Sequence, residues 1–138
     1  MGKQRSWRAG AIAVGVVLAT LFAVTPAASA DGASAASYEA ECFGYTGTFR
    51  DGTIMYIRHW PSGGDECFGI APDRTIWHAW PGSGGWKEMP GNGRADELLA
   101  FPEYADARVV KVRVAGSSTN WCNRNPVGSV SWGKWYRC

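Results

Sequence analysis

The sequence predicts a small all-β domain: a disulfide-stabilised antiparallel β module of the blade, sandwich or barrel-like type. Three observations lead to this fold class. Apolar residues alternate or cluster in short runs between glycine-rich breaks, which is typical of strands. Four cysteines stand in a short chain, and one turn-and-strand pattern occurs twice. With 138 residues, one small domain is the most that the length allows.

The first 30 residues have the layout of a secretory signal peptide. A basic stretch over 1–8 precedes an apolar run over 11–24, and small residues follow up to Ala30. The apolar run is too short to span a bilayer. We therefore expect cleavage before Asp31 and a secreted, extracellular protein that is not embedded in a membrane.

After the leader, residues 31–37 are small and offer nothing to bury, so we expect a mobile N-terminal arm. Residues 38–138 are expected to form a single β domain. The clearest strand pattern is 110–114, where valines alternate with cations. A short helix is indicated only at Ala95–Phe101. The expected strands are Phe43–Phe49, Thr53–Trp60, Thr75–Trp80, Arg108–Ala115, Thr119–Asn123 and Ser129–Arg137.

The charge balance argues against nucleic acid as a partner. The whole chain carries 14 basic and 12 acidic residues, a formal net charge of +2. Three basic residues and no acidic ones fall in the leader, so the mature part has 11 basic and 12 acidic residues, or −1. A nearly neutral domain has no general electrostatic attraction to nucleic acid or anionic lipid.

The four cysteines predict two disulfides, for which three connectivities are possible. We favour Cys42 with Cys67 and Cys122 with Cys138, although a tight hairpin at 126–128 would not place Cys122 directly opposite Cys138. Cys42 and Cys67 each begin a Cys-Phe-Gly triplet. An even number of cysteines is typical of disulfide-bonded exported domains. Each closed loop contributes roughly 3 kcal/mol in the chain-entropy model. No spacing is CxxC or CxH, so we expect no metal site and no cofactor.

A near-repeat is the most informative feature of the chain. A turn acid, a short strand ending in Trp-Pro and a glycine pair occur over 51–64 and again over 73–86. Proline ends each strand and the glycines allow a sharp reversal. The second copy, with Trp77-His78-Ala79-Trp80 and Gly84-Gly85-Trp86, resembles the repeat of secreted β-propeller lectins of the tachylectin and bacterial fucose-binding type. That resemblance implies sugar binding, although a propeller needs at least about four blades and this chain could supply two.

The layout as a whole is similar to that of small secreted actinobacterial proteins. Among these it resembles the adaptor subunits of umbrella toxin particles, in which a small protein joins a lectin subunit to a stalked toxin. The shared features are the size, the leader, the small-residue arm and the terminal Trp135-Tyr136-Arg137-Cys138. The resemblance implies other secreted protein subunits as partners and assigns no role to individual residues.

Patterns typical of enzymes are missing from the sequence. It has no Gly-x-Ser-x-Gly, no His-Glu-x-x-His and no phosphate-binding glycine loop. His59 and His78 stand beside Trp60 and Trp80, which favours packing or hydrogen bonding over catalysis. The acidic pairs at 65–66 and 96–97 are typical of solvated surface. We therefore expect no enzyme and no catalytic residue.

The mature part contains seven tryptophans, which can supply the core of a small β domain. Trp77 and Trp80 are three apart and face opposite sides of a regular strand, so one of them is expected at the surface. We expect two or three exposed tryptophans in total. The candidate ligand-binding residues are Trp80, Trp86, Asn92, Arg94 and Asp96.

The sequence thus predicts a secreted binding module without catalysis. A protein–protein adaptor within an extracellular, toxin-like assembly ranks first. The alternative is a small lectin-like protein that binds glycans through exposed tryptophans. A protease inhibitor is a third, weaker reading.

Overall fold

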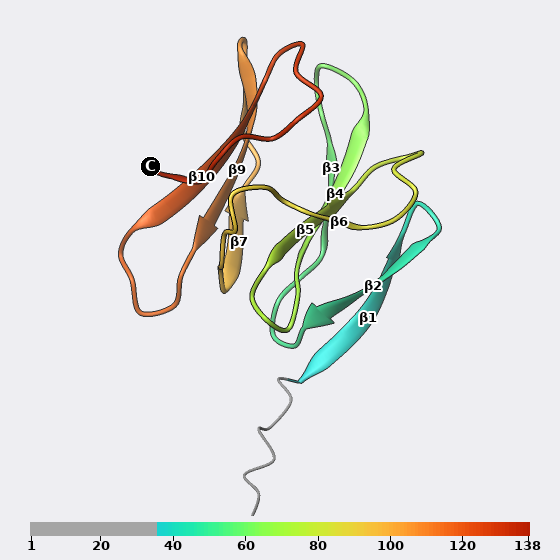
Figure 1. Cartoon of the computed structure of the whole chain (residues 1–138), viewed down its shortest axis with the longest axis vertical. Coiled ribbons are helices and arrows are strands. Elements are labelled where there is room, and N and C mark those ends of the chain that lie inside the picture. The colour runs from blue at the N-terminus through green and yellow to red at the C-terminus, as the bar shows by residue number, and fades with distance from the viewer. Residues whose placement is uncertain (1–35) are drawn as a thin grey trace, which may run out of the picture. The chain divides into compact units, whose positions relative to one another are not determined.

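A computed structural model describes residues 36–138 and shows an all-β, antiparallel fold with no helix among these residues (Figure 1). The expected signal peptide and residues 31–35 of the expected arm lie outside the described range. Ser37, expected in the arm, is instead the first residue of a strand. The strands are β1 (Ser37–Cys42), β2 (Tyr45–Arg50), β3 (Tyr56–His59), β4 (Asp65–Ile70), β5 (Ile76–Ala79), β6 (Lys87–Glu88), β7 (Glu97–Ala100), β8 (Glu103–Tyr104), β9 (Ala107–Arg113), β10 (Asn120–Pro126) and β11 (Tyr136–Arg137).

The two copies of the near-repeat form one four-stranded sheet with the order β3-β4-β5-β6. Each copy begins with a strand that ends at Trp-Pro, β3 before Trp60 and β5 before Trp80. The copies are therefore two hairpins of a single sheet and not two separate blades. The sequence patterns did not predict β4, which lies inside this sheet and pairs with both β3 and β5.

The second sheet has the order β11-β10-β9-β7, and β8 pairs with β9 beyond the end of β7. The helix expected at Ala95–Phe101 is wrong, because this segment holds β7. Leu98 is buried opposite Val112, and the register shifts between Leu98 and Ala100. Tertiary pairing with β9 overrides a weak local preference here.

The strand expected at Ser129–Arg137 is also largely wrong, since only β11 at its end pairs with β10. The chain between β10 and β11 instead brings Trp132 into the core, where only 7% of its surface is exposed. β11 returns opposite β10, with Cys122 facing Tyr136.

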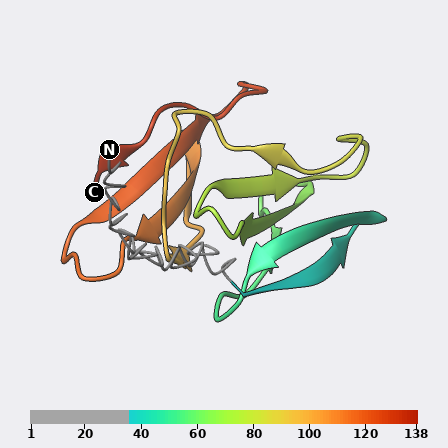
Figure 2. The ribbon, with the colours of Figure 1, turned by 60° about the horizontal axis from the view of Figure 1, so that its bottom comes forward.

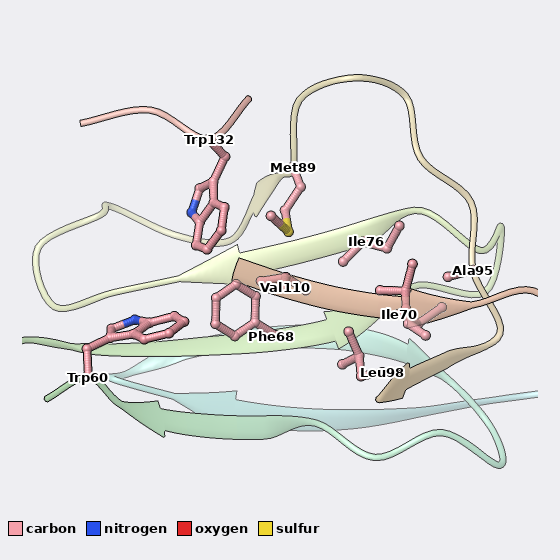
Figure 3. Packing of buried hydrophobic residues seen from close by; sticks show 10 residues of the cluster. Trp60, Phe68, Ile70, Ile76, Met89, Ala95, Leu98, Val110 and Trp132 are labelled. Carbon is pink, nitrogen blue, oxygen red and sulfur yellow. The ribbon is translucent and has the colours of Figure 1, made fainter. Parts of the chain in front are cut away.

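The main core lies between the two sheets and combines side chains from both (Figure 3). Val110 and Val112 are buried in β9 whereas Arg113 is exposed, which confirms the alternation expected there. Burying a large apolar side chain contributes about 1.5–3 kcal/mol. The buried cluster consists of Trp60, Phe68, Ile70, Ile76, Met89, Ala95, Leu98, Val110, Val112 and Trp132.

The hairpin β1–β2 packs on the other face of the four-stranded sheet (Figure 2). A two-residue turn with positive φ at Phe43 and Gly44 connects its strands. The ring of Phe49 lies on Gly69 of β4, and the disulfide Cys42–Cys67 joins the hairpin to the same strand.

Both expected disulfides are confirmed. The Cα atoms are 6.6 Å apart in Cys42–Cys67 and 5.9 Å apart in Cys122–Cys138. The first bond links the hairpin to the four-stranded sheet, and the second closes the C-terminus onto β10. None of residues 36–138 forms a helix long and apolar enough to cross a membrane.

The contact between Phe49 and Gly69 yields the first testable prediction. A Cβ atom at residue 69 would lie 2.2 Å from Cε1 of Phe49. We therefore expect Gly69→Ala to lower the free energy of unfolding by about 1–3 kcal/mol, as overpacking does. Urea denaturation of Gly69→Ala beside Thr48→Ala, an exposed hairpin position, measures this. Equal stability of Gly69→Ala and the wild type would contradict the packing described.

Candidate functional site

A buried carboxylate, Glu66 of β4, holds one end of the core together. Its Oε1 accepts hydrogen bonds from Nε1 of Trp132 at 3.0 Å and from Nδ1 of His78 at 2.6 Å. Its Oε2 accepts one from Nε1 of Trp60 at 3.0 Å. Trp60 and Trp132 lie at the same end of the core in Figure 3. All four residues are buried. The side chain of Glu66 thus connects β4 to β5, to the residue directly after β3 and to the chain after β10.

This arrangement corrects the expectation that the acidic pair at 65–66 is solvated. Asp65 is partly exposed and pairs with His59 at 2.7 Å, but only 6% of Glu66 is exposed. Their side chains point to opposite faces of β4, because successive residues of a strand alternate. Glu66 thereby enters the interior with its donors already in place, as a buried charge requires.

His78 has the hydrogen-bonding and packing role that the sequence indicated. Its ring stacks on Phe68 at 6.2 Å, and its Nδ1 is bonded to the Glu66 carboxylate. A carboxylate only accepts, so Nδ1 of His78 carries the hydrogen of this bond.

Beside this cluster lies an open groove of about 440 Å³, called the Trp80 groove below. Trp80 follows β5 on the same face as His78, and their ring centres are 5.0 Å apart. Trp80 is 38% exposed and forms part of the groove wall. The groove is lined by Gly64, Asp65, Glu66, His78, Trp80, Pro81, Arg108, Asn125, Ser129, Val130 and Trp132.

The charged groups of the Trp80 groove are already partnered within the protein. Arg108 donates from Nη2 to Ser62 and to the carbonyl of Gly63, and its guanidinium lies 5.1 Å from the Trp60 ring centre. Asp65 is bonded to His59, and Glu66 to the two indoles and His78. The groove therefore offers a ligand aromatic surface, uncharged hydrogen-bonding groups and one guanidinium, that of Arg108, whose partners are neutral.

The structure does not bring the five expected site residues into one place. Trp80 lies in the groove described above. Trp86 packs edge-on against Phe49 at 4.7 Å, and its Nε1 donates to the carbonyl of Tyr45 at 2.9 Å. Trp86 therefore holds the β1–β2 hairpin in place.

Asn92 and Arg94 line a different hollow, of about 340 Å³, together with Trp121 and Trp135. Asn92 has a positive φ of 53°, so the loop that carries it turns sharply beside Trp135. No sequence pattern indicates that this loop meets the C-terminal tryptophans, because that contact depends on the path of the chain after β10.

Fewer tryptophans are exposed than the sequence suggested. Trp80 is the exposed one among the seven, Trp60 and Trp132 are buried, and the other four are partly buried. The opposite orientation of Trp77 and Trp80 is confirmed, since Trp77 faces the side of the sheet that also packs against Phe49.

Asp96 links all three sheets and is a structural residue. Arg74 donates from Nε to Oδ1 and from Nη2 to Oδ2 of Asp96, at 2.9 Å each. Arg50 forms a further ion pair with the same carboxylate. The amide of Ala115 donates to Oδ2 at 2.8 Å. Burial alone would raise the pKa of Asp96, but the Ala115 amide and the two guanidinium groups outweigh it and lower that pKa.

Comparison with protein-family models, curated proteins and solved structures finds no match for this chain. Within residues 36–138, no three His, Cys, Asp or Glu side chains are placed to hold a metal ion.

The lowered pKa of Asp96 yields a pH prediction. The pKa of Asp96 is lower in the folded state than in the unfolded chain. Its contribution to the free energy of unfolding is therefore fully present above about pH 4 and is lost as the pH falls further. We expect Asp96→Asn to be less stable than the wild type at pH 7 and to lose less stability on acidification. Asp106→Asn, which removes an exposed ion pair with Arg124, is the control. Parallel stability profiles from pH 7 to pH 2 for Asp96→Asn and the wild type would refute this role.

Proposed function

We propose that this protein is a secreted, non-catalytic carbohydrate-binding module and that its Trp80 groove takes an uncharged sugar ring. The observation that carries the proposal is an exposed tryptophan beside a groove with a fixed, buried hydrogen-bonded floor. The volume of about 440 Å³ falls within the usual range for small-ligand sites, about 300–1,000 Å³. Two disulfides fit a protein of the oxidising extracellular environment.

The chemistry of the groove favours a neutral polyol over a charged ligand. Asp65 and Glu66 are bonded to His59 and His78, and the guanidinium of Arg108 already donates to Ser62 and to the carbonyl of Gly63, so each charged group of the groove has polar contacts within the protein. The indole of Trp80 offers an apolar face of the kind on which a sugar ring can lie. Asn125 and Ser129 add uncharged polar side chains to the lining of the groove.

The Glu66 cluster supports this function by fixing the groove before a ligand arrives. His78 is held between the Glu66 carboxylate and the Phe68 ring, and Trp132 is held by the same carboxylate. Side chains that are already ordered lose little entropy on binding. A shallow groove of this kind can therefore bind without a large conformational change.

The adaptor function remains a second proposal, supported by a different surface. Tyr104 and Val127 are 59% and 66% exposed, and the amide of Val127 donates to the carbonyl of Asp106 in the turn that follows Tyr104. Exposed apolar side chains that gather on adjacent loops are typical of protein interfaces. This surface suits a secreted protein partner.

Two variants distinguish the two proposals, because each removes a side chain from only one of the two surfaces. We expect Trp80→Ala to weaken glycan binding by at least about 30-fold, the cost of a hot-spot aromatic of about 2 kcal/mol. Tyr104→Ser, which removes an exposed aromatic outside the groove, should leave glycan binding unchanged. A glycan array followed by calorimetry on the strongest ligand measures both variants, each first checked for native melting.

The same variants are then used to capture partners from culture supernatant. A wild type that binds no glycan but retains a defined secreted protein, with capture lost in Tyr104→Ser and kept in Trp80→Ala, would replace the carbohydrate proposal with the adaptor. Glycan binding that survives Trp80→Ala would show that the groove is not the site.

A further inference from the structure

The strand β3 forms an unprotected edge of the four-stranded sheet. It is the outer strand of the order β3-β4-β5-β6, and within residues 36–138 no strand pairs with its free side. Ile54, Tyr56 and Ile57 in and before this strand are 64%, 38% and 52% exposed. Large aliphatic side chains at an open edge are unusual in a monomer.

The hydrogen-bond pattern shows which backbone groups of β3 face outward. The amide of Trp60 donates to the carbonyl of Gly64 at 3.0 Å, so residue 60 bonds towards β4. In an antiparallel pair the bonding direction alternates from residue to residue. Tyr56 and Arg58 therefore also bond towards β4, whereas the N–H and C=O groups of Ile57 and His59 point away from the sheet.

Lysine, proline and a bulge, three of the devices that block an edge, are missing from β3, whereas the strand is short and its one cation points inward. Residues 53–60 contain neither lysine nor proline, and the β3–β4 register has no bulge. The one cation of the strand, Arg58, lies on the inner face with its guanidinium 5.2 Å from the Trp60 ring centre.

We propose that β3 pairs antiparallel with β3 of a second copy of this chain, about a two-fold axis at Ile57. In this register Ile57 exchanges both backbone hydrogen bonds with Ile57 of the second copy, because its N–H and C=O groups face outward. On each side of this central pair, Met55 of one copy lies opposite His59 of the other. Trp-Pro at 60–61 ends the ladder, since Pro61 has no amide hydrogen.

The side chains also match in this register. Opposed residues of an antiparallel pair lie on the same face, so Tyr56 meets Arg58 of the second copy on the inner face, where a cation–π contact can form. The two Ile57 side chains meet on the outer face. An interface of this kind is isologous and closes after two copies, which favours a dimer over a filament.

Pairing through β3 leaves the Trp80 groove open, because residues 53–59 do not line it. The dimer would therefore present two grooves, and a repetitive saccharide surface would be bound with avidity. This consequence rests on the proposed function, whereas the pairing itself does not.

A disulfide-trapping experiment tests the register directly. All four native cysteines are bonded, so Ile57→Cys introduces one free thiol. Across the two-fold axis the two Cα atoms of residue 57 would lie about 5.5 Å apart, as in a hydrogen-bonded antiparallel pair, and disulfides span Cα separations of about 4.4–6.8 Å. We expect a covalent dimer on mild oxidation. His59→Cys is the matched control, because it faces Met55 of the second copy and should not crosslink.

Light scattering after gel filtration tests the dimer without any crosslink. We expect the secreted wild type to have twice the monomer mass, and Ile57→Lys to have the monomer mass with unchanged melting of the monomer fold. Ile57→Thr keeps a β-branched side chain and should also weaken the dimer. It provides the test if Ile57→Lys does not fold. A monomeric wild type at high micromolar concentration would overturn the proposal. So would a dimer unaffected by Ile57→Lys, equal crosslinking of both cysteine variants, or a β3 edge that pairs with a strand of another protein. Because glycan binding is measured separately, a failed dimer test does not count against the groove.

Discussion

The buried carboxylate of Glu66 is the interaction on which both the fold and the groove depend. It takes hydrogen bonds from two indoles and one imidazole that come from three different segments. A buried carboxylate without such donors costs several kcal/mol, and one with a complete set of donors fixes the groups around it. The position of Trp132 in particular depends on it, because the chain after β10 has little regular structure before β11.

This constraint also explains how the tryptophans divide between structure and surface. Trp60 and Trp132 are held inside by the Glu66 carboxylate, Trp77 lies on the hairpin side of the sheet, and Trp86 is fixed by a backbone carbonyl. Trp80 stands one residue beyond β5 and remains exposed. The carbohydrate proposal therefore rests on Trp80, whereas packing and hydrogen bonding explain the buried indoles.

Local patterns predicted the all-β class, both disulfides, the alternation in β9 and the opposite faces of Trp77 and Trp80, because each depends on neighbours in the sequence or on small loops. They failed for β4, for the burial of Glu66 and for β7. The local sequence Asp65-Glu66 is typical of a polar loop, and it forms part of a strand because β3 and β5 pair with it on either side. In the same way, β7 forms a strand because it pairs with β9. The candidate site was found in part: Trp80 is exposed in a groove, but Asn92 and Arg94 belong to another hollow and Trp86 and Asp96 hold the sheets together.

The most direct test of the role of Glu66 is the free energy of unfolding of Glu66→Gln, measured by urea denaturation beside Asp65→Asn. Glutamine keeps the shape but turns an acceptor into an NH₂ donor that faces other donors, so we expect a loss of about 3 kcal/mol. The neighbouring Asp65→Asn, which removes a partly exposed contact with His59, should change stability by less than about 0.5 kcal/mol. A Glu66→Gln variant as stable as Asp65→Asn would contradict the account.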